Sequence, residues 1–181
     1  MTPVAPRLHH REQAWCLAAN RWGGRQVVRA YFRAVSRLGD GLFWYALMAF
    51  FALFDGWRGL SASGHMLATG AIAALLYRKL KRWTKRPRPF AADARIQAWV
   101  APLDEYSFPS GHTLHAVSFT LVALAYYPML GMLLVPFTLS VALSRVVLGM
   151  HYPSDVLAAT VIGGTLASVS LWLVPGVSLF F

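Results

Sequence analysis

Three short segments of this sequence bring basic and imidazole side chains to the ends of long apolar runs. The segments are residues 81–89, 109–112 and 144–155. Together they supply lysine and arginine cations, two histidines and one aspartate. That combination suits phosphoryl transfer, because cations neutralise the phosphate oxygens and planar guanidinium groups add paired hydrogen bonds.

The two histidines could take different chemical roles. One imidazole can attack phosphorus if a carboxylate fixes its tautomer, and Asp155 lies one helical turn after His151. A second imidazole can donate a proton to the leaving oxygen. The backbone amides of residues 110–112 begin an apolar run, and a helix N-terminus there would bind an anion. The sequence shows no carboxylate cluster typical of a Mg²⁺ or Zn²⁺ site, so we expect side-chain cations to balance the phosphate charge, with no metal and no cofactor.

The composition excludes an ordinary soluble domain. Of the 181 residues, 57% are hydrophobic and 13% are charged, whereas soluble globular chains carry about 45–50% apolar and about 25% charged residues. Seven Trp, seven Tyr and eleven Phe argue against intrinsic disorder. The single cysteine, Cys16, excludes an internal disulfide and a cysteine-based metal cluster, and we expect it to fill space in the core.

The positive charge is unevenly distributed along the chain. The formal net charge of +10 follows from 17 Lys and Arg against 7 Asp and Glu. Seven of these cations lie in residues 1–40 and eight in residues 78–95, with only Arg58 and Arg145 elsewhere. Basic clusters separated by long uncharged runs are typical of a membrane protein whose charges lie on its loops. We therefore expect a lipid bilayer around the protein and no nucleic-acid partner.

Five apolar stretches could cross a bilayer, which takes about 20 mostly apolar residues. They are residues 41–54 with the flanking Trp57 and Leu60, residues 59–77, residues 109–127, residues 129–149 and residues 156–175. Residues 25–38 predict an amphipathic helix, with arginine at every fourth position opposite an apolar face, that lies on the membrane surface or packs on the protein's own helices. The predicted fold is all-α, a single domain over residues 1–181. It consists of an Arg-rich amphipathic segment, 1–40, and a polytopic membrane helix bundle, 41–181.

Five spans place all three chemical segments and the N-terminus on one membrane face. That face would carry sixteen of the 17 Lys and Arg, and the opposite face only Arg58. If the site residues Lys81, Arg88 and Arg145 are left out, the two faces still carry thirteen and one Lys or Arg. The positive-inside rule then predicts an integral membrane protein with its N-terminus and its site on the cytoplasmic face, and the short chain fits a bacterial inner membrane.

The three segments resemble the signature motifs of the type-2 phosphatidic acid phosphatase superfamily, which includes bacterial lipid phosphatases and vanadium-dependent haloperoxidases. The motifs here are Lys81, six residues, then Arg88-Pro89; Pro109-Ser110-Gly111-His112; and Ser144-Arg145, five residues, His151, three residues, Asp155. Every signature position has the expected residue type and spacing. Many bacterial relatives have six spans, and here the Arg-rich helix would replace the first.

The resemblance implies a membrane enzyme that hydrolyses a lipid phosphate or a polyprenyl pyrophosphate without metal, through a phosphohistidine. It implies that His151 is the nucleophile, that Asp155 orients it and that His112 is the general acid. It assigns phosphate binding to Lys81, Arg88, Ser110, Gly111 and Arg145. Two alternatives are a non-catalytic membrane protein that binds lipid or a partner, and a haloperoxidase-like enzyme.

Other polar residues carry less specific expectations. We expect His65 to lie at a membrane interface or to hydrogen-bond between helices, and His115 could support the site. Asp104 and Glu105 could gate entry or pair with Arg95. We expect membrane-surface or headgroup charges at Arg82, Lys85 and Arg86, and close helix packing along the small residues Thr160, Gly164 and Ser168.

Overall fold

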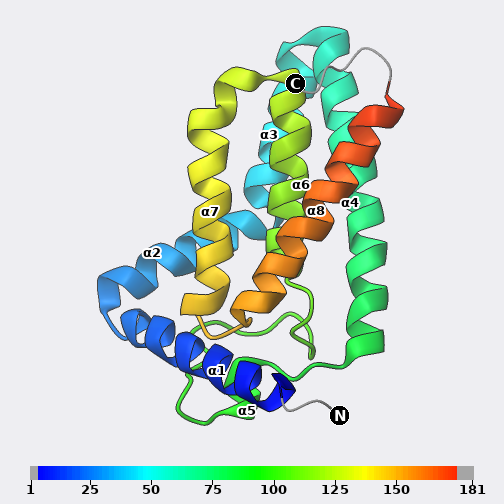
Figure 1. Ribbon diagram of the computed structural model, residues 1–181. Helices are drawn as coiled ribbons and strands as arrows, with labels where there is room; N and C mark the ends of the chain where they lie inside the picture. The colour runs from blue at the N-terminus through cyan, green and yellow to red at the C-terminus, as the bar shows by residue number, and fades with distance from the viewer. Residues whose placement is uncertain (1–3, 175–181) are drawn as a thin grey trace.

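The computed structural model describes the backbone of residues 4–174 and the side chains of residues 11–174. Every regular element in that part of the chain is a helix, as predicted. In chain order the elements are α1 (Val4–Gly23), α2 (Gln26–Arg37), the π-helical turn η1 (Leu38–Leu42), α3 (Phe43–Phe54), α4 (Gly56–Thr84), α5 (Pro89–Ala92), α6 (Gly111–Tyr126), the 3₁₀ turn η2 (Pro128–Leu130), α7 (Gly131–Val147) and α8 (Pro153–Leu173). Figure 1 shows α3, α4, α6, α7 and α8 running along the long axis of the molecule, with α1 and α2 lying across it.

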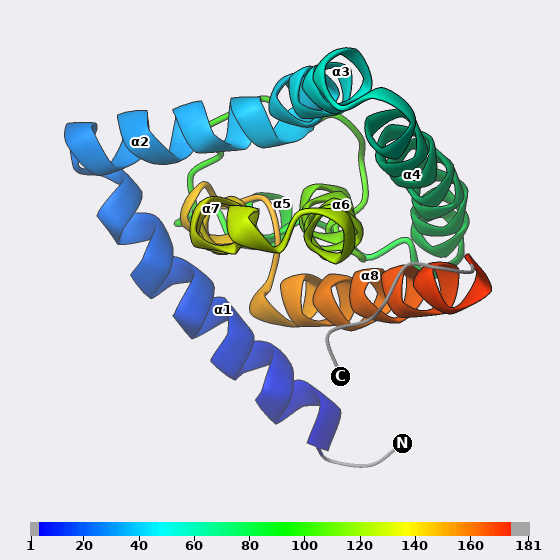
Figure 2. The same ribbon diagram turned by 90° about the horizontal axis from the view of Figure 1, so that it is seen from above.

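Four stretches of the described chain are long and apolar enough to cross a membrane: Gln26–Phe54, Gly56–Ala92, Pro128–Val147 and Pro153–Leu173. The remaining predicted span corresponds to α6, whose 16 residues are fewer than the about 20 that a bilayer needs. Figure 2 shows α6 and α7 nearly end-on, surrounded by α1, α2, α3, α4 and α8. Nine residues of α6 are buried. The predicted helical membrane bundle is therefore confirmed, with α6 as its central helix.

Large apolar side chains hold the long helices together. Trp44, Met48, Met66, Phe119 and Leu134 are buried in one cluster between α3, α4, α6 and α7. The ring centroids of Trp44 and Phe119 lie 5.4 Å apart, within the range of favourable aromatic contacts. This core fixes the helices against one another, so that the groups at their ends are held in place.

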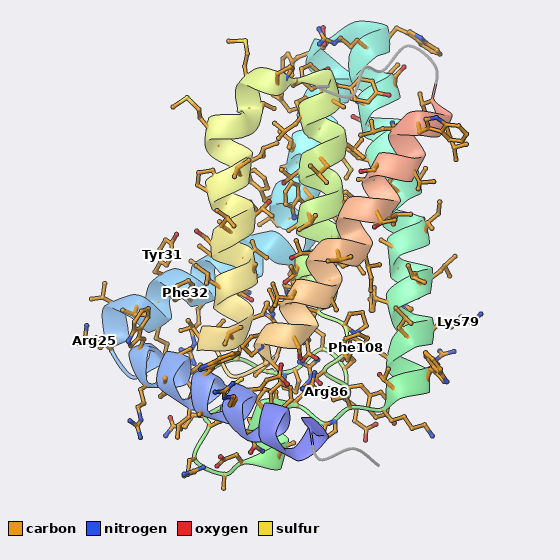
Figure 3. All side chains as sticks on the ribbon, viewed as in Figure 1. Arg25, Tyr31, Phe32, Lys79, Arg86 and Phe108 are labelled. Atoms are coloured by element: carbon orange, nitrogen blue, oxygen red, sulfur yellow. The ribbon has the colours of Figure 1, made fainter. Side chains whose placement is uncertain are left out.

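Helices α2 and α3 are joined at a bend in η1. Gly41 has a φ of 129°, a conformation that glycine adopts far more readily than other residues. The bend turns α2 across the bundle while α3 runs along it (Figure 1). The helix predicted at 25–38 is thus present, but its apolar face is divided, because Val35 is buried whereas Val27 is 82% exposed. The Tyr31 hydroxyl, on the exposed part of α2 (Figure 3), hydrogen-bonds to Ser140 of α7 at 2.9 Å.

The first predicted span, residues 41–54, is extended at its N-terminal end and not, as expected, at its C-terminal end. Helix α3 ends at Phe54, and the backbone N–H of Asp55 bonds to the carbonyl of Phe51 at 3.1 Å. Trp57 and Leu60 therefore belong to α4. The expectation that they complete the first span was wrong, since the apolar helical stretch that contains α3 continues toward the N-terminus instead, over Gln26–Phe54 with the bend at Gly41.

Helix α8 packs through a stripe of small residues that is shifted by one position from the predicted stripe. Ala159, Gly163 and Ala167 are buried, whereas Thr160 and Ser168 are exposed and Gly164 is half-buried. A Cβ at Gly163 would lie 2.8 Å from the carbonyl oxygen of Leu114 in α6. The two helices are therefore in backbone contact at this point, which only glycine allows.

Candidate functional site

The three motif segments meet at one end of the bundle. Figure 1 places there the C-terminal ends of α4 and α7 and the N-terminal ends of α6 and α8, with α1 beneath them. Residues 85–110, which include α5, close the same end. The structure therefore brings together residues that are more than seventy positions apart in the sequence.

His151 lies in the turn between α7 and α8 and is 2% exposed. Its Nδ1 is 2.6 Å from the carbonyl oxygen of Ser107, which can only accept, so Nδ1 carries a proton. Its Nε2 is 3.3 Å from Nη1 of Arg88, which can only donate, so Nε2 keeps its electron pair. Burial, together with the charges of Arg145, Arg88 and Lys81, holds the pKa of His151 well below 6.5. The site thus presents a neutral imidazole whose unprotonated nitrogen is Nε2.

Asp155 is fully buried in the first turn of α8. Its Oδ2 lies 3.7 Å from Nδ1 of His151, which is too long for a hydrogen bond. Oδ2 instead accepts from the backbone N–H of Tyr152 at 2.9 Å, and Oδ1 accepts from Nη1 of Arg86 at 2.6 Å. The direct orienting bond that we expected from Asp155 to His151 is therefore replaced by the carbonyl of Ser107, and Asp155 places a negative charge beside the imidazole.

Lys81 at the end of α4 and Arg88 just before α5 are 5% and 3% exposed. Both contact Asp104: Nζ of Lys81 is 2.7 Å from each carboxylate oxygen, and Nη2 of Arg88 is 2.6 Å from Oδ1. Burial alone would raise the pKa of Asp104, but the hydrogen bonds and charges of Lys81 and Arg88 outweigh it and lower the pKa. The alternative partner expected for Asp104 was wrong, because Arg95 pairs with Asp93 at 2.7 Å.

The Pro-Ser-Gly-His segment forms the start of α6. Ser110 is fully buried, and its Oγ accepts a hydrogen bond from the backbone N–H of Thr113 at 3.4 Å. This is an N-cap contact, which stabilises a helix start. Gly111 and His112 are the first two residues of α6 and line the adjacent cavity. Their amides precede the first intrahelical hydrogen bonds and are therefore available to a ligand.

Two of the predicted residues contact the end of α2 and the turn η1 that follows it. Nε2 of His112 is 3.4 Å from Oδ1 of Asp40 in η1. Nη1 of Arg145 donates to Oγ of Ser36 on α2 at 2.5 Å. The Nε of Arg145 is buried, with no hydrogen-bond partner among the described residues. Residues 36–40 therefore form one wall of the site, which no sequence pattern had indicated.

A cavity of about 760 Å³ joins these groups. Lys81, Arg88, His112, Arg145 and His151 line it, together with apolar side chains from three helices, namely Trp44, Tyr45, Leu67, Ala71, Ala74 and Phe119. Tyr45 and Leu67 are 62% and 51% exposed, so the cavity reaches the outer surface of the bundle between α3 and α4. Such a cavity can hold a phosphate beside His151 and an apolar chain along its wall.

The other histidines have structural contacts. His65 bridges three helices, with Nδ1 3.2 Å from the hydroxyl of Tyr126 and Nε2 3.0 Å from that of Ser170, so its predicted interhelical role is confirmed. His115 lines the cavity, and its nitrogens lie 3.0 Å and 3.2 Å from the carbonyl oxygens of Gly111 and Gly70. His115 thereby connects α6 to α4 next to the site.

Sequence reasoning missed the partners of the motif residues. Arg86, expected to be a membrane-surface or headgroup charge, instead lies among the side chains at the closed end of the bundle (Figure 3) and pairs with Asp155 and with Glu12 of α1. Ser107 is fully buried, three residues before Ser110. The one available signal was proximity in sequence, because Arg86 and Ser107 flank motif residues, whereas nothing marked Glu12.

Comparison with known proteins agrees with this geometry. A family model described as "PAP2 superfamily" matches residues 62–178, which is more than half of the chain. The chain belongs to the PAP2 superfamily. The match contains all three motif segments, and it begins after α1, α2 and α3.

Individual PAP2 relatives align with different parts of the chain. It is 34% identical over 143 residues to the decaprenylphosphoryl-5-phosphoribose phosphatase of Mycolicibacterium smegmatis, an alignment that covers 74% of this chain and 72% of the relative. It is 36% identical over 94 residues to phosphatidylglycerophosphatase B of Haemophilus influenzae, covering 44% of this chain and only 39% of that protein. The crystal structure of a PAP2-type phosphatidylglycerolphosphate phosphatase from Bacillus subtilis matches with a TM-score of 0.77 at 23% identity, covering 97% of this chain and 90% of that chain. The last comparison shows a shared fold.

Proposed function

We propose that this protein is a membrane phosphatase that hydrolyses a lipid phosphate or a polyprenyl pyrophosphate through a phosphohistidine, without a metal ion. The observation that carries the proposal is the tautomer of His151. Its proton is on Nδ1, and the electron pair of Nε2 lies beside the guanidinium of Arg88 in the cavity. A neutral imidazole next to phosphate-binding cations is the arrangement that nucleophilic attack on phosphorus requires.

The first half-reaction uses these groups in turn. Lys81, Arg88 and Arg145 hold the phosphate oxygens and neutralise their charge. Nε2 of His151 attacks phosphorus, the bond from phosphorus to the lipid oxygen breaks, and His112 gives that oxygen a proton. The products of this step are the free alcohol (or the monophosphate, from a pyrophosphate) and a phosphohistidine.

The second half-reaction reverses the role of His112. Now unprotonated, it takes a proton from water as the water oxygen attacks phosphorus. The bond between phosphorus and Nε2 breaks, the electron pair returns to His151, and inorganic phosphate leaves. Asp155 supplies negative charge beside the imidazole while His151 carries the phosphoryl group.

Three observations support a lipid substrate. The cavity has an apolar wall and reaches the outside of the bundle at Tyr45 and Leu67, where a bilayer would meet it. Four described stretches are long and apolar enough to cross a membrane. Two relatives bear names that state a lipid phosphate, decaprenylphosphoryl-5-phosphoribose and phosphatidylglycerophosphate.

For the membrane orientation we propose a cytoplasmic site in a bacterial inner membrane. Sixteen of the 17 Lys and Arg belong to the N-terminal segment and to the end of the bundle that holds the motifs. Helices α1 and α2 lie across the long axis (Figure 1), an arrangement that suits interfacial helices. Such a site would act on lipids of the inner leaflet.

A substrate panel tests this function. Purified protein in detergent with EDTA should release phosphate from at least one of phosphatidic acid, lysophosphatidic acid, phosphatidylglycerophosphate and undecaprenyl pyrophosphate. A soluble sugar phosphate is the control for the apolar wall. His151→Ala should fold and lose turnover, which would exclude a non-catalytic lipid-binding protein. Strict dependence on an added divalent metal would contradict the mechanism, and halide oxidation with added vanadate would favour the haloperoxidase alternative.

A further inference from the structure

One face of α1 is attached to the catalytic end of the bundle. Glu12, Cys16 and Asn20 recur every fourth residue and are 6%, 0% and 4% exposed. Asn20 bonds to the backbone of Gln97 and Val147, and the Sγ of Cys16 lies 3.8 Å from the carbonyl oxygen of His151. This face therefore packs directly under the turn that carries His151.

Glu12 connects that face to Asp155 through Arg86. Its Oε2 is 2.7 Å from Nη2 of Arg86, whose Nη1 is 2.6 Å from Oδ1 of Asp155. Its Oε1 accepts from the backbone N–H of Ser154 at 3.1 Å, at the N-terminus of α8. The side chains of Glu12 and Asp155 are 7% and 0% exposed and that of Arg86 is 23% exposed, so solvent screens the group weakly.

The net charge of Glu12, Arg86 and Asp155 acts on the imidazole of His151. A pair made of Arg86 and Asp155 alone would be neutral and would give the imidazole little stabilisation. Two carboxylates around one guanidinium leave one net negative charge. Because cations surround His151, a buried negative charge beside it favours the positive charge that develops on the imidazole as Nε2 bonds to phosphorus.

We propose that Glu12 is a positioning residue for catalysis, which acts through Arg86 by restoring the negative charge of Asp155 and fixing the start of α8. This inference rests on the proposed function. Helix α1 lies outside the segment matched by the family model, and through Glu12 it would influence the reaction at His151.

Every neighbouring element contributes a charged or titratable group near His151. These groups are Lys81 of α4, Arg88 before α5, Asp104 in the loop, His112 of α6, Arg145 of α7, Asp155 of α8 and Cys16 of α1. Glu12→Gln alters none of these groups itself and keeps an oxygen acceptor for the backbone N–H of Ser154. A shift in the titration of His151 therefore reports the charge of the triad formed by Glu12, Arg86 and Asp155.

The decisive variant is Glu12→Gln, which keeps the size and acceptor of the side chain and removes its charge. Attack needs neutral His151, so the low-pH side of the pH profile of kcat/KM, its acid limb, follows the pKa of His151. Loss of a negative charge favours the neutral imidazole, so this limb should move to lower pH by about half a unit. At the pH optimum kcat should fall about tenfold while KM changes little, since residues in such networks modulate a site without contacting its ligand. Glu12→Asp, which keeps the negative charge, should restore the position of the acid limb and the value of kcat.

Two further variants separate charge from structure. Asn20→Ala removes hydrogen bonds from the same face of α1 without changing charge, so it should lower Tm and leave the pH limb in place. Arg86→Gln removes a positive charge and should move the limb to higher pH. An acid limb in Glu12→Gln that matches wild type, with a rate loss no larger than that of Asn20→Ala, would overturn the inference.

Titration of His151 by NMR, in protein labelled at histidine and assigned with His151→Gln, reads the same charge coupling without turnover. A lower pKa of His151 in Glu12→Gln than in wild type is expected, and an equal pKa would contradict the coupling. Wild-type protein with no activity on any lipid phosphate would refute the proposed function, while the NMR comparison would still test the triad.

Discussion

Nζ of Lys81 lies 2.7 Å from both carboxylate oxygens of Asp104. The same carboxylate is 2.6 Å from Nη2 of Arg88, so it occupies the space between two cations that we assign to the substrate phosphate. A phosphate that bound to both cations would have to displace Asp104 or share them with it. Lys81 is buried, whereas the side chain of Asp104 is 38% exposed, and the loop that carries Asp104 is free of regular helix between Ala92 and Gly111.

Removing this competing charge should strengthen binding of small anions. In Asp104→Asn, inhibition by inorganic phosphate or vanadate should tighten about tenfold, because hydrogen bonds to charged groups contribute about 1.5–3 kcal/mol. Glu105→Gln is the matched control, since Glu105 lines the cavity one residue further along the loop. Product-inhibition kinetics measure the effect. Equal inhibition constants in the two variants would show that Asp104 does not compete with phosphate.

The two histidines should fail in different ways. His112→Ala should slow hydrolysis of a lipid phosphate by about 10²- to 10⁴-fold, the usual contribution of a general acid. It should slow release of the phenol from an aryl phosphate much less, because a phenolate leaving group needs little protonation. His151→Ala should abolish turnover of both substrates. The rate of leaving-group release before the steady state measures both effects. Equal rate losses on the two substrates in His112→Ala would contradict the general-acid role.

Close packing of α8 on α6 should make Gly163 intolerant of a side chain. Gly163→Leu should lower the free energy of unfolding by about 1–3 kcal/mol or more, because an overpacked contact forces the backbones apart. At Gly164 the nearest atom to a new Cβ is Leu121 Cδ1 at 4.0 Å, so Gly164→Leu should be tolerated. Thermal unfolding in detergent compares the two. A similar Tm for both variants would show that the helices can separate at little cost.

The membrane orientation can be read by cysteine labelling. In a Cys16→Ala background, Arg95→Cys marks the catalytic end and Trp57→Cys the opposite end, and both side chains are exposed, at 72% and 83%. In intact cells an impermeant maleimide should label position 57 and should reach position 95 only after lysis. The reverse pattern would place the site outside the cytoplasm.

The sequence predicted the site better than it predicted the helices that support it. Motif spacing and alternation of the spans were enough to bring Lys81, His112 and His151 to one end, because those relationships are local or follow from topology. Glu12, Ser36 and Asp40 contact the motif residues across the bundle, and a single sequence carries no signal for such long-range pairs. The stripe on α8 was displaced by one position, because Gly163 and Gly164 are equally small and only packing distinguishes them.

The central claim is that His151 carries the phosphoryl group, and trapping that group tests it most directly. His112→Ala incubated with a ³²P-labelled aryl phosphate should form the intermediate and hydrolyse it slowly, because water lacks its general base. After denaturation, the account predicts label approaching one phosphate per protein on the peptide that contains His151, stable in base and lost in acid, and none in the His151→Ala, His112→Ala double variant. Phosphate release without such label, or label that persists in the double variant, would contradict it.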